Sequence, residues 1–202
     1  MKARVIAIVV AGLMAACSRP APDASFADRL LAARAMKDDQ FRTAPDSPIP
    51  PDKRAQFLPL SYFPPDEDYV ASASLAPAGR NERLTAEMPT SRGLTRRMLR
   101  VGTLKFMLKG QSLTLAPFVE ADAQETDRLF VPFTDLTSGT ETYSAGRYIE
   151  LERTPTGIYM IDFNRAFNPY CYYNPTYDCP FPPAENRLTV PVRAGEKVRA
   201  LK

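Results

Sequence analysis

The sequence contains no histidine among its 202 residues and only three cysteines. Without histidine there is no Ser-His-Asp or Cys-His nucleophilic machinery, no histidine general base and no imidazole ligand for a metal ion. Any catalysis would have to rest on carboxylates, tyrosine, lysine, arginine, serine or a cofactor. The composition therefore disfavours an enzyme, and we expect neither a metal ion nor a cofactor.

The sequence also lacks a strong excess of charge of either sign. Its formal net charge is +3, and two of the bases, Lys2 and Arg4, lie in the leader described below. The arginines are spread along the chain, apart from four between positions 92 and 100, which are typical of a solvated face. This excludes the electrostatic footprint of a nucleic-acid-binding protein. With 45% hydrophobic residues, the chain can bury one sizeable core, and its length favours one domain.

The first seventeen residues have the pattern of a secretory signal. Residues 1–4 are positively charged, residues 5–13 are apolar, and small residues precede Cys17. The apolar run is too short to span a bilayer. Its end resembles the bacterial lipoprotein box, in which the cysteine becomes the acylated N-terminus. An ordinary cleaved signal is the alternative, but it would leave Cys17 as an unpaired thiol in an oxidising compartment.

We therefore predict a signal peptide over 1–16, a lipidated Cys17, a tether over 17–24 and a single globular domain over 25–202. Each buried CH₂ of an acyl chain contributes about 0.8 kcal/mol, so two or more chains make a stable anchor in the lipid bilayer. The protein is expected to be exported and to face the periplasm or the cell surface. Ser18 after the cysteine mildly favours an outer membrane.

The start of the domain predicts one helix followed by a proline-rich crossover. A helix is expected over residues 26–41, with Ser25 as its capping residue, and its stripe Phe26, Leu30, Ala33 and Met36 is expected to face the core. Residues 43–65 hold seven prolines interleaved with aromatic residues, which indicates an ordered crossover with a short helix near 52–57.

The rest of the chain predicts β-structure. The fold class is α+β, mainly β, with an antiparallel barrel- or sandwich-like sheet of about seven or eight strands. If Lys109-Gly110 forms a two-residue turn, Phe106 faces Leu113 and Leu104 faces Leu115 on an apolar face. The expected strands are 69–76, 83–88, 99–108, 112–119, 129–133, 147–153, 158–163 and 188–192.

A second hairpin is predicted around the turn at 154–157. Its register would place Glu150 opposite Asp162 on one face and Ile149 opposite Phe163 on the other. Like charges directly opposite each other are unfavourable in a sheet. The two carboxylates are therefore spread in solvent, with Asp162 bonding the backbone beyond it, or neutralised by an arginine, or they form an acid or oxygen-ligand pair.

The segment from 169 to 183 is stiff and aromatic, with five prolines, four tyrosines and two cysteines. Cys171 and Cys179 most simply form a disulfide in an exported chain, since a redox pair usually has Cys-x-x-Cys spacing and zinc would need further ligands. The tyrosines either offer a stacking surface for a sugar or other planar ligand, or cover the protein's own core.

A series of short motifs runs along the mature chain. They are Ser61 to Phe63, Val101 to Thr103, Glu141 to Tyr143, Gly146 to Tyr148, Asp162 to Asn164, Asn168-Pro169, Cys171, Cys179-Pro180, Pro182-Pro183, Glu185-Asn186 and Ala194 to Lys197. Together they resemble a bacterial and archaeal family, the domain of unknown function 1684. The resemblance implies no assigned activity. Ser144 and Ala145 stand where many relatives are expected to have glycine, which disfavours a glycine loop for phosphate.

These observations favour an envelope lipoprotein that acts as a ligand-binding or accessory module for a small polar or anionic ligand. The alternatives are a carboxylate-dependent hydrolase, with Asp162 or Glu185 working with Glu150, and a purely structural protein. In the binding interpretation Arg147 orients the ligand. The full set of expected binding residues is Tyr143, Arg147, Tyr148, Asn164, Asn168 and Asn186.

Overall fold

The computed structural model describes residues 24–79, 85–122 and 127–199. The predicted signal peptide, Cys17 and nearly all of the tether lie outside these residues. So does the start of the strand expected at 83–88. No helix within the described ranges is long and apolar enough to cross a membrane.

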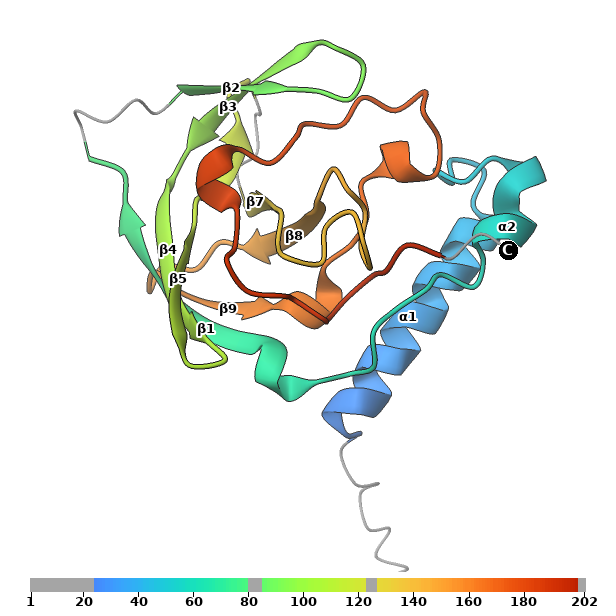
Figure 1. The fold of residues 1–202 in the computed structure, drawn as a ribbon, viewed down its shortest axis with the longest axis horizontal. Coiled ribbons are helices and arrows are strands. Elements are labelled where there is room, and N and C mark those ends of the chain that lie inside the picture. The colour runs from blue at the N-terminus through green and yellow to red at the C-terminus, as the bar shows by residue number, and fades with distance from the viewer. Residues whose placement is uncertain (1–23, 80–84, 123–126, 200–202) are drawn as a thin grey trace, which may run out of the picture.

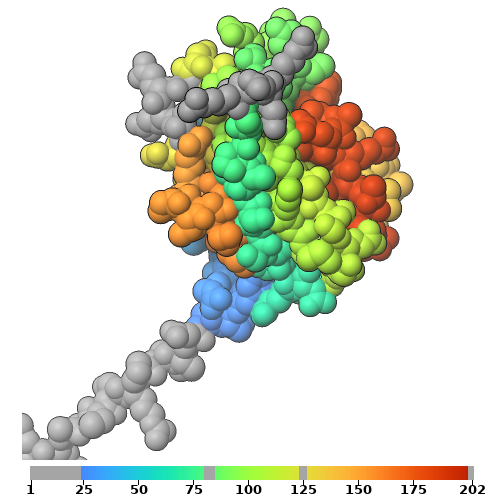
Figure 2. Space-filling model, turned by 90° about the vertical axis from the view of Figure 1, so that its left-hand side faces the viewer, coloured from blue at the N-terminus to red at the C-terminus, as the bar shows by residue number. Residues whose placement is uncertain are grey.

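Two antiparallel sheets form the body of the protein, with the helices α1 and α2 beside them (Figure 1). In Figure 2, β9 in orange, β1, β4 and β5 follow one another across the visible face. The first sheet has the order β5-β4-β1-β9, with β1 Val70–Pro77, β4 Gly102–Leu108, β5 Gln111–Leu115 and β9 Ile158–Asp162. The second has the order β2-β3-β6-β7-β8, with β2 Thr85–Pro89, β3 Thr95–Arg100, β6 Phe118–Glu120, β7 Arg128–Phe133 and β8 Arg147–Glu152.

The inner faces of the two sheets pack against each other in one hydrophobic core. Fully buried residues such as Leu104 and Ile161 come from the first sheet, and Val131 and Phe133 come from the second. This sandwich-like arrangement confirms the predicted fold class. Apolar burial of this kind is the main favourable term in folding.

Two of the predicted strands are each divided where the chain passes from one sheet to the other. The strand expected at 99–108 breaks at Val101 into β3 and β4, and the strand expected at 112–119 breaks at Ala116-Pro117 into β5 and β6. Pro117 has no N–H to donate to a ladder, but its carbonyl accepts a hydrogen bond from Val101 N–H over 2.9 Å. The two bends therefore lie side by side.

The hairpin at Lys109-Gly110 is confirmed in register. Phe106 pairs with Leu113 and Leu104 pairs with Leu115, and all four side chains are buried. Lys109 adopts a φ of 47° and Gly110 a φ of 78°, the left-handed conformations that this two-residue turn requires.

The second predicted hairpin has the right faces but the wrong partners. Ile149 and Phe163 are buried, as expected, but β8 pairs with β7 and β9 pairs with β1. Glu150 therefore lies opposite Phe130 and Asp162 lies opposite Val70, so the predicted carboxylate pairing across one ladder is wrong. The turn predicts a reversal of the chain, but the partner of each strand is decided by how the two sheets pack.

The prediction of a strand at 188–192 is also wrong. Leu188, Val190 and Val192 are buried with the alternation of a strand, but the segment is irregular. Its hydrogen bonds go to separate groups, such as Leu188 N–H to the carbonyl of Thr134 over 2.8 Å. An alternating apolar pattern reports burial of one face and does not require a neighbouring strand.

Helix α1, Phe26–Thr43, confirms the predicted helix, but its buried face differs from the predicted stripe. Ala33 is exposed, and Met36 is 74% exposed. Leu30 is buried as predicted, but Arg34 and Phe41 are the other buried residues of the helix. Arg34 can lie inward because its guanidinium stacks 4.4 Å from the ring centroid of Tyr62 and donates to the carbonyl of Phe63 over 2.8 Å.

The crossover contains the expected short helix as η1 Pro51–Lys53 and α2 Arg54–Phe57. The crossover builds a second, smaller core with α1 and with Tyr172 and Tyr173, two tyrosines of the stiff segment 169–183. The Phe57 ring meets both of them edge-on with centroids 5.4 Å apart. These two tyrosines therefore cover the core, as one of the two sequence interpretations states.

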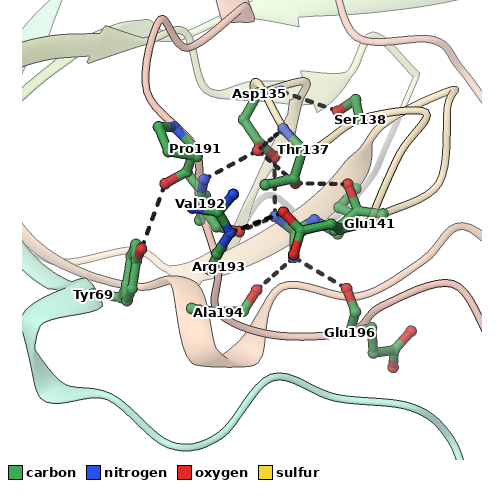
Figure 3. A network of polar contacts seen from close by, with 12 residues as sticks. Tyr69, Asp135, Thr137, Ser138, Glu141, Pro191, Val192, Arg193, Ala194 and Glu196 are labelled. Atoms are coloured by element: carbon green, nitrogen blue, oxygen red, sulfur yellow. Dashed lines mark hydrogen bonds and ion pairs between the residues drawn. The ribbon is translucent and has the colours of Figure 1, made fainter.

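The guanidinium of Arg147 holds the C-terminal segment against β8 and the loop after β7. Arg147 is 1% exposed, and its Nη2 bonds Asp135 Oδ2 over 3.0 Å and the carbonyl of Val192 over 2.8 Å. Its Nη1 donates to the carbonyls of Ala194 and Glu196. Figure 3 shows Asp135 close to Val192, Ala194 and Glu196 of the C-terminal segment. Burial lowers the pKa of Arg147, and the Asp135 carboxylate opposes that shift.

We expect the substitution Arg147→Ala to lower the free energy of unfolding by about 3–5 kcal/mol, because it leaves the Asp135 carboxylate buried without its cation. Urea denaturation followed by circular dichroism measures this loss. The control Arg42→Ala removes an exposed ion pair to Asp39 and should cost less than about 1 kcal/mol. Equal losses for the two variants would contradict the structural role of Arg147.

Candidate functional site

Residues 167–180, which we call the strap, cross the outer face of the second sheet. At one end Phe167 and Tyr148 of β8 exchange backbone hydrogen bonds of 2.9 and 3.0 Å. At the other end Pro180 pairs with Thr90, just after β2, and Ser91 N–H donates to the carbonyl of Cys179 over 2.9 Å. Since β8 and β2 are the two edges of this sheet, the strap is fixed across its whole width.

A cleft of about 640 Å³ lies between the strap and the sheet. Its floor is apolar and comes from the outer faces of four strands. Its walls combine side chains of the strap with charged side chains of the sheet and one lysine of α1. The lining residues used below are Lys37, Arg96, Met98, Phe118, Glu120, Arg128, Phe130, Tyr148, Glu150, Phe167, Tyr170, Tyr177, Asp178 and Cys179.

Aromatic rings line both sides of the cleft. Phe130 and Tyr148 on the sheet meet edge-on with centroids 4.7 Å apart, and Tyr148 meets Phe167 at 5.9 Å. On the strap, Tyr170 and Tyr177 meet at 5.3 Å, and Tyr170 is 42% exposed. Tyr170 and Tyr177 of the four loop tyrosines thus line the cleft, and their use as a stacking surface for a ligand stays a prediction.

The hydroxyl of Tyr148 fixes the strap to the sheet. It donates to the carbonyl of Pro180 over 2.6 Å. Burial raises the pKa of Tyr148, so the hydroxyl keeps its proton at neutral pH and remains a donor.

The charges in the cleft are balanced. Arg96 pairs with Glu120 at 3.2 Å and Arg128 pairs with Glu150 at 3.1 Å, in both cases across neighbouring strands. Such pairs offer donors and acceptors close together without a strong field of one sign. This lining fits a neutral or zwitterionic ligand better than a highly charged one.

The cation of α1 in the cleft, Lys37, is held by the buried carboxylate of Glu196. Lys37 Nζ lies 2.7 Å from Glu196 Oε1 and 4.9 Å from the ring centroid of Phe167. Glu196 is 1% exposed and also accepts from the Tyr173 hydroxyl over 2.7 Å and from Asn168 N–H over 2.8 Å. One carboxylate thus joins the helix, the strap and the C-terminal segment.

Sequence reasoning missed the importance of Glu196. The residue appears in the Ala-Gly-Glu-Lys motif, but nothing in a pattern of residue types says that this carboxylate is buried. The neighbouring Gly195 has a φ of 77°, and a Cβ there would lie 2.5 Å from the carbonyl oxygen of Ala166. The sequence signal for a buried Glu196 is the glycine directly before it, because glycine is typical of positions where the backbone turns closely against another segment.

Tyr148 and Glu150 are the predicted site residues that the structure places in the cleft. The three predicted asparagines are buried, and their side chains bond mainly the protein backbone, with one further bond from Asn164 to the Asp162 carboxylate. Asn164 bonds the backbone of Asp66 from both ends of its amide, and Asn168 Nδ2 donates to the carbonyl of Lys197 over 3.3 Å. The side-chain amide of Asn186 accepts a hydrogen bond from Ala116 N–H and donates one to the carbonyl of Ala116.

Each predicted catalytic carboxylate is bound to a different partner. Asp162 accepts hydrogen bonds from the backbone N–H and the side chain of Asn164, in line with the sequence interpretation that it bonds the backbone beyond it. Glu185 pairs with Arg100 on the surface at 3.1 Å. Asp162 and Glu150 both border a second open hollow of about 780 Å³, which is shared with the start of α1.

Tyr143 and the two cysteines form a group at one side of the strap. The Tyr143 hydroxyl is hydrogen-bonded to Cys171, and burial raises its pKa to about 12. Cys171 and Cys179 are present as two thiols, with Cys171 N–H donating to Cys179 Sγ over 3.2 Å. The disulfide between them stays a prediction. Within the described ranges, no group of three His, Cys, Asp or Glu side chains could hold a metal ion.

Comparison with known proteins places this fold among proteins without an assigned activity. Residues 55–197 match the family model described as protein of unknown function (DUF1684). The chain is 41% identical to an uncharacterised protein of Haloarcula marismortui with a solution NMR structure. That alignment covers 84% of this chain and 92% of the other, with a TM-score of 0.65. No curated protein matches the chain.

Proposed function

We propose a ligand-binding function for this chain, which belongs to the DUF1684 family of proteins of unknown function. It acts as an envelope lipoprotein, anchored to a membrane through acylated Cys17. Its β-sandwich holds a small sugar or sugar-like ligand in the cleft between the strap and the second sheet. The observation that carries this proposal is the cleft itself, with aromatic rings on both sides and paired charges around them.

The anchor is supported by the leader sequence. A positive start, an apolar run and small residues before Cys17 are together typical of a lipoprotein signal. Helix α1 begins at Phe26, so few residues separate the acylated cysteine from the folded domain. A domain held this close to a bilayer would act on ligands of the envelope.

The ligand class is supported by the chemistry of the cleft. A sugar has apolar C–H faces, which pack on exposed aromatic rings such as Tyr170, and hydroxyl groups, which bond paired acids and bases such as Arg128 and Glu150. A volume of about 640 Å³ lies within the range of small-molecule sites. Since the charges are balanced, a neutral or zwitterionic sugar is favoured over a polyanion.

The anchor predicts that the protein partitions into the detergent phase when cell extracts are separated with Triton X-114. The variant Cys17→Ala should move to the aqueous phase or remain as the uncleaved precursor, because it offers no thiol to acylate. Immunoblotting of both phases, with mass spectrometry of the N-terminal peptide, gives the result. An unacylated wild-type protein would refute the anchor.

The cleft predicts that Tyr170→Ala weakens the binding of envelope sugars. We expect a loss of about two- to tenfold, since one aromatic stacking contact is worth about 0.5–1.5 kcal/mol. The probes are N-acetylglucosamine oligomers and soluble peptidoglycan fragments, measured by isothermal titration calorimetry on the full-length protein in detergent.

The matched control is Phe181→Ala. Phe181 is an aromatic residue of similar exposure, 38%, which does not line the cleft. It should bind sugar as the wild type does. If neither probe binds the wild-type protein, or if both variants lose the same affinity, the sugar-binding proposal is wrong.

A further inference from the structure

We propose that Cys171 and Cys179 form a redox-active dithiol that exchanges with disulfides of other molecules, with Cys171 as the attacking thiol and Cys179 as the resolving thiol. This inference does not rest on the proposed sugar binding or on the membrane anchor. It rests on the contacts and the unequal burial of the two sulfur atoms.

The two cysteines are close together but lie in different environments. Cys171 is half-buried, whereas Cys179 is 8% exposed. The thiols are hydrogen-bonded to each other, and Cys171 N–H donates to Cys179 Sγ. A molecule approaching from solvent therefore meets Cys171 first, while Cys179 is placed to attack the sulfur of Cys171 from inside.

Two hydrogen-bonding groups lie next to the sulfur of Cys171, the thiol of Cys179 and the hydroxyl of Tyr143. Ser91 lies beside the pair, where its Oγ accepts from Cys179 N–H over 3.0 Å and donates to the carbonyl of Tyr177 over 3.3 Å. Tyr143 is held by its ring contact with Tyr172, whose centroid lies 5.2 Å away. Groups that donate to a sulfur stabilise its thiolate form.

The titration of the pair agrees with these contacts. The hydrogen bond from Cys179 is the largest cause that lowers the pKa of Cys171 to about 6. The same hydrogen bond and burial raise the pKa of Cys179. The opposite directions of the two pKa shifts make Cys171 the thiol of the pair that ionises first. A thiolate with a pKa near ambient pH is the most effective attacking species in exchange.

The exchange balances without any metal or cofactor. The Cys171 thiolate attacks one sulfur of an external disulfide R–S–S–R′, forms a mixed disulfide with R–S and releases R′–S⁻. Cys179 then loses its proton to solvent, attacks Cys171 Sγ and releases R–S⁻. The protein is oxidised by two electrons to the Cys171–Cys179 disulfide, and R–S–S–R′ is reduced to two thiols. The reverse direction reduces the protein's own disulfide.

This inference changes the expected behaviour of the pair. A purely structural disulfide resists reduction by thiol buffers, whereas stabilisation of the Cys171 thiolate favours the reduced form and makes the disulfide more oxidising. The spacing of the two cysteines is wider than in Cys-x-x-Cys motifs, but the strap still brings Cys179 Sγ to 3.2 Å from the backbone nitrogen of Cys171.

The first test follows the reduced full-length protein in detergent after mixing with glutathione disulfide at pH 7. Samples are quenched in acid, alkylated and analysed by mass spectrometry of the peptide that spans both cysteines. We expect both thiols to disappear within minutes, with two equivalents of glutathione released for each protein. Thiols that remain after an hour, or a disulfide that millimolar glutathione never reduces, would overturn the proposal.

The second test separates the roles of the two cysteines. Cys179→Ser should accumulate a mixed disulfide with glutathione on Cys171, and Cys171→Ser should form one on Cys179 at least tenfold more slowly. Equal rates would show that the assigned roles are wrong. The near-ultraviolet circular dichroism of each variant checks that its fold is retained.

The third measurement has a readout that a purely structural role would not move. The rate at which iodoacetamide alkylates Cys171 is followed from pH 4 to 9 in Tyr143→Phe and in wild type. Loss of the hydroxyl donor should raise the pH midpoint of alkylation, because the thiolate loses one of its hydrogen bonds. An unchanged midpoint would contradict the role assigned to Tyr143.

Discussion

The carboxylate of Glu196 lies inside the protein at 1% exposure, so it must find its partners there, because an unpaired buried charge is strongly destabilising. Its partners come from three separate parts of the chain. Lys37 belongs to α1, and Asn168 and Tyr173 belong to the strap. Arg147 holds the chain at this acid and just before it, through the carbonyls of Val192, Ala194 and Glu196. The helix, the strap and the sandwich are therefore joined through a segment that has no regular secondary structure.

This junction explains why a cleft persists where a loop would otherwise collapse onto the sheet. The strap is held at β8 by Phe167, at β2 by Pro180 and between them by Asn168 and Tyr173 on Glu196. Its prolines limit the backbone conformations that remain between these points. The sheet beneath it stays apolar at the floor and charged at the rim, and Tyr170 remains exposed above it. A rigid loop across a sheet is a common way to position binding groups.

Local patterns predicted the elements of this fold, but not the partners of its buried charges. The Lys109-Gly110 hairpin and α1 follow from turn chemistry and periodicity, which act within a few residues. The partners of Glu150 and Asp162 depend on which strands meet when two sheets close, and the hairpin turn between them carries no information about that. Arg147 reads as an exposed ligand-binding base in the sequence, because burial of a cation requires partners such as Asp135 that lie far along the chain. Within the cleft, Tyr148 could be predicted as part of a site, since it lies in a strand beside the tyrosine-rich loop.

The central claim is that Glu196 holds the strap and α1 onto a sandwich that is stable without it. Hydrogen–deuterium exchange of Glu196→Gln, with Glu141→Gln as a control for a surface carboxylate paired with Arg193, tests it most directly. The amide of glutamine keeps the shape but weakens the bonds to Lys37 and Asn168. The account predicts faster exchange in α1 and in residues 167–180, with unchanged protection in β1, β4 and β5 and no change in the control. Unchanged protection of the strap in Glu196→Gln, or an equal loss over the whole chain, would contradict it.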